Sequence, residues 1–167
     1  MRKSTSLDVF IKGSYLGGIS WALIILRLVM GILFFVAGWS KLMIDDGWSA
    51  AGYLQQATGP FASWFQSLAG NVVVNQLNIW GLLLIGLSLF FGLFIRPAAF
   101  FGILIMLLYY FSDFVGNTAY GLIDKHIVYA AVLFLFFVGG FGHIFGIDGL
   151  IERRLDQRHK WIRVFFG

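Results

Sequence analysis

The chain has 167 residues, of which 59% are hydrophobic and only 12% are charged. Soluble domains carry about 25% charged and about 45–50% apolar residues, so twelve basic and eight acidic side chains are too few to cover a water-exposed surface. This composition excludes a soluble enzyme and also a disordered chain, which would be poor in apolar residues.

Four apolar segments are long enough to cross a bilayer, whose hydrocarbon core needs about 20 mostly apolar residues per helix. They predict helices over about 19–40, 74–95, 97–112 and 127–147. The first segment is too long for a signal peptide, contains Arg27 and has no small-residue cleavage site after it. We therefore expect a single all-α domain over 1–167, an integral membrane four-helix bundle.

The connection between the first and second helices is long, and part of it is amphipathic. Over about 60–69, apolar side chains recur at helical spacing, whereas Ser63, Gln66 and Ser67 fall on other faces. The apolar positions are Phe61, Trp64, Phe65 and Leu68. This pattern predicts an additional helix lying in the membrane interface, with a re-entrant or simply packed loop as the alternative.

The connection between the second and third helices is the shortest in the chain. It consists of little more than Arg96 and Pro97. Proline is favoured in the first turn of a helix, where its missing N–H costs no hydrogen bond. So short a turn makes the second and third helices antiparallel neighbours.

Lysine and arginine are distributed unevenly about the predicted helices. Nine lie in the N-terminal segment, the turn at Arg96 and the basic tail over 150–167, whereas Lys41 and Lys125 lie on the opposite side. Basic residues accumulate on the cytoplasmic side of membrane proteins. We therefore expect a multi-pass protein of the cell membrane with both termini in the cytoplasm.

Arg27 lies about eight residues into the first predicted helix, roughly 12 Å from its start. An arginine at that depth is costly unless it is paired or reaches the headgroups. It indicates either a buried cation that binds a polar headgroup or holds a polar network, or a side chain that snorkels to the cytoplasmic surface.

On the outer half, polar residues from all four predicted helices converge. Asn71, Asn75 and Asn78 form a stripe at helical spacing, and the other members come from the helix ends. These are Lys41, Tyr109, Tyr110, Asp113, Asp124, His126 and Tyr129. A quinone headgroup needs donors for two carbonyl oxygens and a group that titrates near neutral pH, which histidine supplies. The alternative is a set of solvated helix ends, since tyrosine and tryptophan collect at interfaces.

Other cofactors and ligands are disfavoured. Without cysteine the chain holds no disulfide, thiolate zinc site or iron–sulfur cluster, and we expect no metal site. His126 and His143 are about 25 Å apart on the predicted fourth helix, so a haem would need a ligand from another chain. The basic tail beside a membrane helix favours anionic lipid over nucleic acid.

The order of motifs along about residues 20–150 resembles the DoxX family, and particularly its DoxD-like branch. The first helix carries Arg27-x-x-x-Gly31 and then Gly38-Trp39-Ser40-Lys41-Leu42. The turn reads Gly92-Leu93-Phe94-Ile95-Arg96-Pro97. The last helix starts Asp124-Lys125-His126-Ile127-Val128-Tyr129 and closes with Gly140 to Asp148. Many relatives carry an acid early in the second helix, where this chain has Asn75, Gln76 and Asn78.

The resemblance implies the small membrane subunit of an archaeal-type thiosulfate:quinone oxidoreductase, which works with a partner subunit. In that role the chain would supply the membrane anchor and part of a quinone site, with Lys41, Asn78, His126 and Tyr129 at the ligand and Arg27 in an internal network. A non-catalytic structural subunit of a larger respiratory complex is the alternative. A small transporter is a third, although neither an inverted repeat nor broken helices are evident.

Overall fold

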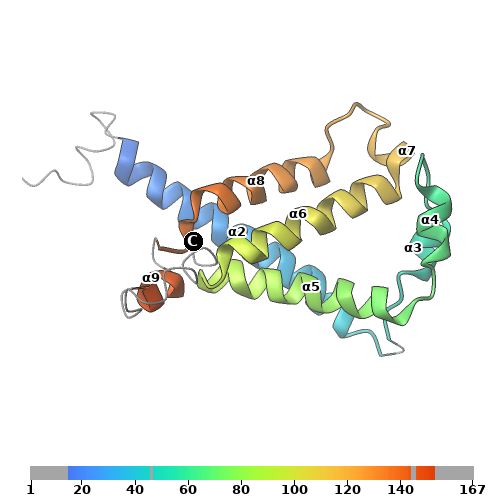
Figure 1. Cartoon of the computed structure of the whole chain (residues 1–167), viewed down its shortest axis with the longest axis horizontal. Helices are drawn as coiled ribbons and strands as arrows, with labels where there is room; N and C mark the ends of the chain where they lie inside the picture. The colour runs from blue at the N-terminus through green and yellow to red at the C-terminus, as the bar shows by residue number, and fades with distance from the viewer. Residues whose placement is uncertain (1–14, 46, 144–145, 153–167) are drawn as a thin grey trace, which may run out of the picture.

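The computed structural model describes residues 15–45, 47–143 and 146–152, and the regular elements among them are helices joined by loops (Figure 1). None of these residues forms a strand, and one isolated bridge joins Thr58 to Asp113. The predicted all-α fold class is confirmed. The basic tail predicted over 150–167 lies outside the described residues from position 153 onward.

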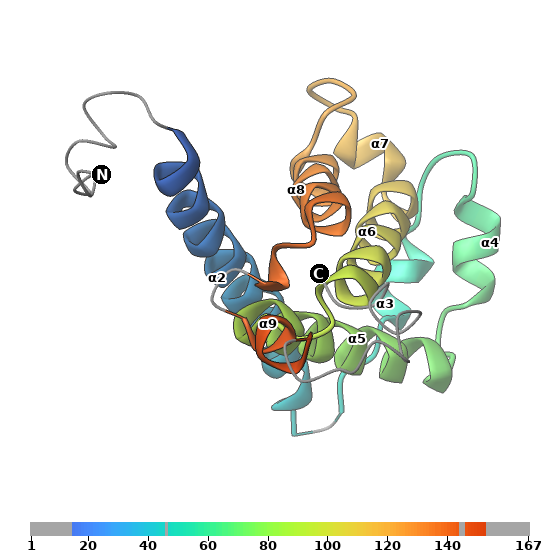
Figure 2. The same ribbon diagram turned by 60° about the vertical axis from the view of Figure 1, so that its left-hand side comes forward.

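Four long helices form the body of the molecule. They are α2 (Tyr15–Leu42), α5 (Val72–Phe91), α6 (Ile95–Ser112) and α8 (Lys125–Gly139). Helix α2 packs on α5, α5 on α6 and α6 on α8, and Figures 1 and 2 show this row of neighbours from two sides. Three of the described helices are long and apolar enough to cross a membrane, at Gly18–Leu42, Val72–Phe91 and Ile95–Ser112.

The turn between α5 and α6 is short, as the sequence predicts. It begins after Phe91, a few residues before the predicted end of the second helix at position 95. Helix α5 ends at Phe91 because Gly92 adopts the left-handed conformation, with φ of 66°, and its N–H returns to the Ser88 carbonyl. Pro97 lies in the first turn of α6, where its lack of an N–H costs nothing. The two helices pack as antiparallel neighbours.

Helix α8 is shorter than the predicted span of 127–147. It ends at Gly139 because Gly140 is left-handed, with φ of 57°, and donates its N–H to the Phe136 carbonyl. The short 3₁₀ helix η1 (Phe141–His143) and helix α9 (Ile147–Glu152) follow. Glycine is the residue that most readily adopts this helix-ending conformation, so the Gly139-Gly140 pair ends the helix despite the apolar residues beyond it.

At one end of the bundle, the connection from α2 to α5 and the connection from α6 to α8 contain three short helices. This end is here called the α7 end. The short helices are α3 (Ala51–Gln55), α4 (Ala62–Ser67) and α7 (Phe114–Asn117). Helix α4 lies within the span predicted over 60–69 and is shorter than it. The apolar residues of the predicted pattern are not all buried. Phe65 is buried against Leu54 and its neighbours, whereas Phe61 and Trp64 remain about half exposed.

The core lies between the four long helices and is tightest where α2 meets α5. Phe34, Leu89, Leu133 and Phe136 are fully buried within one apolar cluster. Glycines let the two backbones approach closely: a Cβ on Gly31 would lie 2.8 Å from the Phe90 backbone nitrogen, and one on Gly38 would lie 2.8 Å from that of Leu83. These glycines act as helix contacts, as small residues do in membrane bundles.

Candidate functional site

Buried polar residues form two separate groups, one at each end of the bundle. The first lies where α9 covers the α5–α6 turn, here called the α9 end. Arg27 is only 2% exposed, and its Nη1 donates a hydrogen bond to the Phe141 carbonyl at 2.9 Å. The side chain therefore turns into the protein and does not snorkel to solvent.

Asp148 completes the group at the α9 end. Its side chain is fully buried and accepts hydrogen bonds from the backbone N–H groups of Phe94 at 2.8 Å and Ile95 at 3.3 Å. Its own N–H donates to the Gly92 carbonyl at 2.9 Å. The N-cap residue of α6, Phe94, has no side chain that could accept a hydrogen bond from the first N–H groups of this helix. Asp148 supplies the missing acceptors from a distant segment of the chain. It also interacts electrostatically with Arg27.

The second group lies at the α7 end and joins three helices. Asn78 of α5 and Tyr109 of α6 form a reciprocal pair. The Asn78 Nδ2 donates to the Tyr109 hydroxyl at 2.6 Å, and that hydroxyl lies 2.9 Å from the Asn78 Oδ1. The ring of Tyr109 meets the ring of His126 edge to face, with 5.8 Å between the centroids. Tyr109 therefore connects Asn78 to His126.

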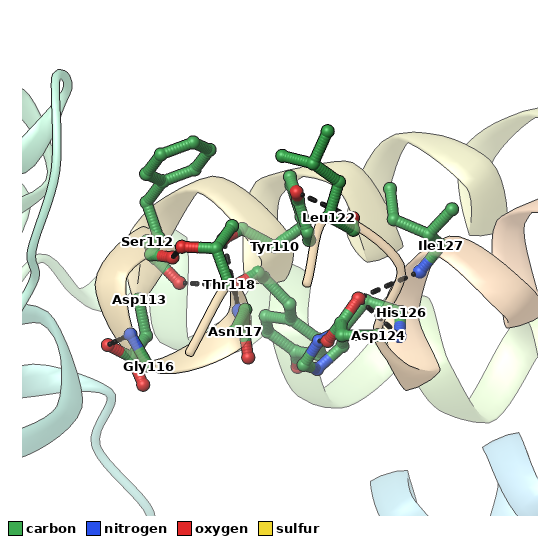
Figure 3. Close-up of polar contacts among 12 residues, drawn as sticks. Tyr110, Ser112, Asp113, Gly116, Asn117, Thr118, Leu122, Asp124, His126 and Ile127 are labelled. Atoms are coloured by element: carbon green, nitrogen blue, oxygen red, sulfur yellow. Dashed lines mark hydrogen bonds and ion pairs between the residues drawn. The ribbon is translucent and has the colours of Figure 1, made fainter. Parts of the chain in front are cut away.

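Asp124 holds His126 at the start of α8 (Figure 3). Its Oδ1 accepts from the backbone N–H groups of His126 and Ile127, both at 3.1 Å, and so caps the helix. Its Oδ2 lies 2.5 Å from the His126 Nδ1. Burial alone would raise the pKa of Asp124, but the hydrogen bonds from Ile127 and His126 outweigh it, so the pKa falls below the usual value.

Several of the other polar residues predicted to converge on this half form hydrogen bonds outside the group. Asn71 caps α5 by accepting from the Val73 N–H, and Asn75 accepts from the Ala50 N–H. The predicted stripe of three asparagines therefore contributes only Asn78 to the group that contains His126. Asp113 caps α7 and accepts from the Thr58 hydroxyl, which ties the two loops together.

Lys41 and Tyr129 lie at the same end and are not hydrogen-bonded to this group. The Lys41 Nζ donates to the Ala37 carbonyl at 3.3 Å and lies 5.0 Å from the centre of the Trp48 ring. Tyr129 is half-buried against the core, and its hydroxyl has no hydrogen-bond partner within the described residues. The structure thus links Asn78 to His126 through Tyr109, whereas the Lys41 ammonium and the Tyr129 hydroxyl are not bonded to either residue.

Arg27 is remote from the other four predicted site residues. It lies fourteen positions before Lys41 on the continuous helix α2, a separation of about 21 Å along the axis. It therefore belongs to the group at the α9 end.

Tyr53 of α3 adds a further polar contact beside Tyr109. Its hydroxyl accepts from the Ser112 Oγ at 3.0 Å and donates to the Tyr109 carbonyl at 3.4 Å, and the two tyrosine rings meet edge to face. Burial and the nearby charges of Asp113 and Asp124 raise the pKa of Tyr53, although the Ser112 hydrogen bond lowers it. Tyr53 thus stays protonated and keeps α3 against the site. The amphipathic pattern did not indicate this contact.

Two surface hollows lie near this end. One has a volume of about 480 Å³ and is almost wholly apolar, lined by Phe61, Trp64, Phe65, Leu108 and Phe111. The other, of about 270 Å³, lies along the α7–α8 loop beside Asp124 and Lys125. Among the described residues, no group of three or more histidine, aspartate or glutamate side chains is placed to hold a metal ion.

The DoxX family profile matches residues 22–113, which is more than half of the chain and covers the region from α2 to the end of α6. The chain belongs to the DoxX family. Together with the three membrane-length helices, this makes it a membrane protein. Neither the curated proteins nor the solved structures compared with the chain give a match.

The DoxX match divides the group at the α7 end. Asn78 and Tyr109 lie within the matched residues, as do Arg27 and Lys41. Asp124, His126 and Tyr129 lie beyond them, on α8 and its N-cap. The polar group is therefore assembled from α5 and α6, which the match covers, and from α8, which lies beyond it.

Proposed function

We propose that this DoxX protein is the membrane subunit of a quinone-linked oxidoreductase, in which the α7 end forms part of a quinone-headgroup site. The observation that carries the proposal is the connected group Asn78–Tyr109–His126, in which amide, phenol and imidazole side chains from three helices meet. It lies where α6 ends, so an apolar molecule dissolved in the bilayer can reach it along the helix surface.

The chemistry of these side chains suits a quinone. Asn78 and Tyr109 offer an N–H and an O–H donor, and the hydrogen bonds they now share can be exchanged for bonds to a carbonyl oxygen. His126 supplies an imidazole, whose two ring nitrogens can donate or accept a hydrogen bond. Lys41 and Tyr129, whose polar ends are not bonded to this group, complete the proposed set around the ligand. Arg27 acts at a distance by holding the α9 end together.

The finer proposal is a DoxD-like role in thiosulfate oxidation. Two thiosulfate ions join through a new S–S bond to give tetrathionate, and the two electrons released pass to a quinone that also takes up two protons. Because the chain has no cysteine, we propose that the redox centre that oxidises thiosulfate belongs to a partner subunit. We also propose that both termini lie in the cytoplasm and the α7 end outside, because nine of the twelve basic residues occur in the terminal segments and at the α5–α6 turn.

The test is to extract the chain from its native membranes in detergent and to identify the proteins that copurify. We expect a partner that carries its own cofactor and a complex that reduces a short-chain quinone with thiosulfate. His126→Ala and Lys41→Ala should leave the complex assembled and lower this turnover at least tenfold. The matched controls are Lys125→Ala and Gln76→Ala, which change exposed positions beside the site.

A structural subunit of a larger complex is the second candidate, and the broad apolar surface favours it. Phe100 and Phe101 on α6 and Phe134 on α8 are each more than half exposed, and surfaces of this kind pack equally well against lipid or a neighbouring subunit. Unchanged quinone turnover in both His126→Ala and Lys41→Ala would reject the quinone site and leave this second function.

A further inference from the structure

The pairing of His126 with Asp124 determines which imidazole nitrogen carries the proton. An ionised carboxylate can only accept hydrogen bonds. With the Asp124 Oδ2 2.5 Å from the His126 Nδ1, a neutral imidazole must therefore carry its proton on Nδ1. This tautomer follows from the hydrogen-bond geometry. The Nε2 nitrogen is then a bare acceptor.

The rest of the site keeps this arrangement fixed. Only 12% of each of the two side chains is exposed, so water does not easily replace either partner. The Oδ1 of Asp124 is already held by the N–H groups of His126 and Ile127, which sets the direction of Oδ2 (Figure 3). The edge-to-face contact with Tyr109 fixes the other side of the imidazole ring.

The Nε2 atom makes no hydrogen bond within the described residues. The Tyr109 hydroxyl is bonded to Asn78, and the nearby Tyr129 hydroxyl does not reach the imidazole. The side chain is only 12% exposed, but its Nε2 is not among the fully buried polar atoms, so a ligand can reach it. A ligand that brings a donor fits best there, because a ligand without one leaves the hydrogen bond unmade.

We propose that Asp124 is a positioning residue that holds neutral His126 with its Nε2 as an acceptor, so that the site binds the hydroxyl of a quinol in preference to the carbonyl of the corresponding quinone. This inference rests on the proposed quinone site and adds which redox form of the ligand the site favours. The quinol offers an O–H to Nε2, whereas the quinone places an oxygen lone pair against another lone pair. A site built to receive a hydroxyl rejects the analogue that lacks the donor.

The preferred form is the product of the proposed reaction. A tenfold difference in affinity corresponds to about 1.4 kcal/mol, which lies within the usual cost of an unmade hydrogen bond. We therefore expect the chain to bind a short-chain benzoquinol at least tenfold more tightly than the matching benzoquinone. The measurement is made at about pH 8.

Asp124→Asn is the decisive variant. Asparagine caps helices as well as aspartate does, so its Oδ1 can keep the N–H groups of His126 and Ile127. Its Nδ2 then faces the imidazole as a donor, Nδ1 becomes the acceptor, and the proton moves to Nε2. The variant should therefore reverse the preference and bind the quinone more tightly than the quinol. Asp113→Asn is the matched control, because Asp113 caps α7 in the same way and is not paired with a histidine.

Two measurements on the detergent-solubilised full chain test the inference. Tryptophan fluorescence under anaerobic conditions gives the affinities for the benzoquinone and the benzoquinol. Nitrogen-15 NMR of histidine-labelled protein, assigned with His126→Gln, identifies the nitrogen that carries the proton. We expect an Nδ1–H tautomer in the unaltered chain and in Asp113→Asn, and an Nε2–H tautomer in Asp124→Asn.

The outcomes separate this inference from the proposed function. If neither ligand binds, the quinone site and the ligand preference both fail, and the NMR result still decides whether Asp124 sets the tautomer. If both ligands bind and their affinity ratio is the same in the unaltered chain and in Asp124→Asn, the quinone site stands and the role of Asp124 is rejected. An Nε2–H tautomer in the unaltered chain overturns the inference directly.

Discussion

The two ends of this bundle both bury polar side chains, but they use them differently. At the α9 end, both carboxylate oxygens of Asp148 accept hydrogen bonds from the backbone N–H groups at the start of α6, and Arg27 donates a hydrogen bond to the carbonyl of Phe141. At the α7 end, Asn78, Tyr109 and His126 contact one another, and the imidazole keeps one nitrogen available. Buried charge alone therefore does not identify a functional site; polar side chains from several helices that contact one another are a better indicator.

The largest expected effect tests the structural role of the α9 end. Asp148→Ala leaves the N–H groups of Phe94 and Ile95 without their acceptor, in a place that water does not reach. We expect a loss of about 3 kcal/mol in the free energy of unfolding, measured in detergent. Asp45→Ala, at an exposed acid, is the control and should change it little. Equal stability of the two variants would show that the α9 end does not depend on this carboxylate.

Glycine substitutions at the two ends sharpen the comparison. Gly92 and Gly70 are both left-handed, with φ of 66° and 81°, so alanine strains both by about 1 kcal/mol. A Cβ on Gly92 would also lie 2.6 Å from the Gly146 Cα and 2.9 Å from the Arg27 Nη1, whereas one on Gly70 meets open space. We expect Gly92→Ala to lower the unfolding free energy by about 2 kcal/mol more than Gly70→Ala does, by thermal denaturation in detergent. Equal losses would contradict the close packing at the α9 end.

Substitution of the adjacent residues Tyr109 and Tyr110 distinguishes an effect on stability from an effect on ligand binding at the α7 end. Tyr109→Phe loses its bond to Asn78, and Tyr110→Phe loses its bond to the Leu122 carbonyl. Each should cost about 1 kcal/mol of stability. Only Tyr109→Phe should also weaken binding of a short-chain quinone, by severalfold, in a fluorescence titration. A similar weakening in Tyr110→Phe would mean that the effect is transmitted through the fold.

The smallest effect is a pH dependence from Asp124. Its pKa in the folded chain lies below that of an unfolded aspartate, so its contribution to stability is present above about pH 4 and is lost as the pH falls through the folded pKa. Thermal unfolding followed from pH 6 down to pH 3 should therefore show a smaller acid-induced loss in Asp124→Asn than in the unaltered chain. An identical loss in both would indicate that other carboxylates dominate the acid response.

The sequence predicts the long helices because membrane spans depend on local properties. Uninterrupted apolar runs and the position of Pro97 are enough to place α2, α5 and α6. The prediction extends the fourth helix to position 147 because apolar residues continue past Gly140. A single glycine that adopts the left-handed conformation is a weaker signal in the sequence than a long apolar segment. Helices α3 and α7 have only five and four residues, too few to show a period.

The candidate site was predictable in its residue types but not in its connections. Asn78 and His126 stand out as polar side chains near predicted helix ends. That Tyr109 joins them, whereas Asn75 turns to the backbone of Ala50, depends on how α5, α6 and the loop pack. Asp148 caps a helix that starts 53 positions earlier, a pairing that no local pattern reveals.

The short α8 also affects the surrounding membrane. Its 15 residues rise about 22 Å, against a hydrocarbon core of about 30 Å, while its outward side chains, such as Phe134 and Val138, remain apolar and exposed. For α8 to cross the bilayer, the lipid beside it would have to thin, whereas lipid beside the membrane-length helix α2 would not. Such a one-sided mismatch costs a fraction of a kcal/mol per ångström.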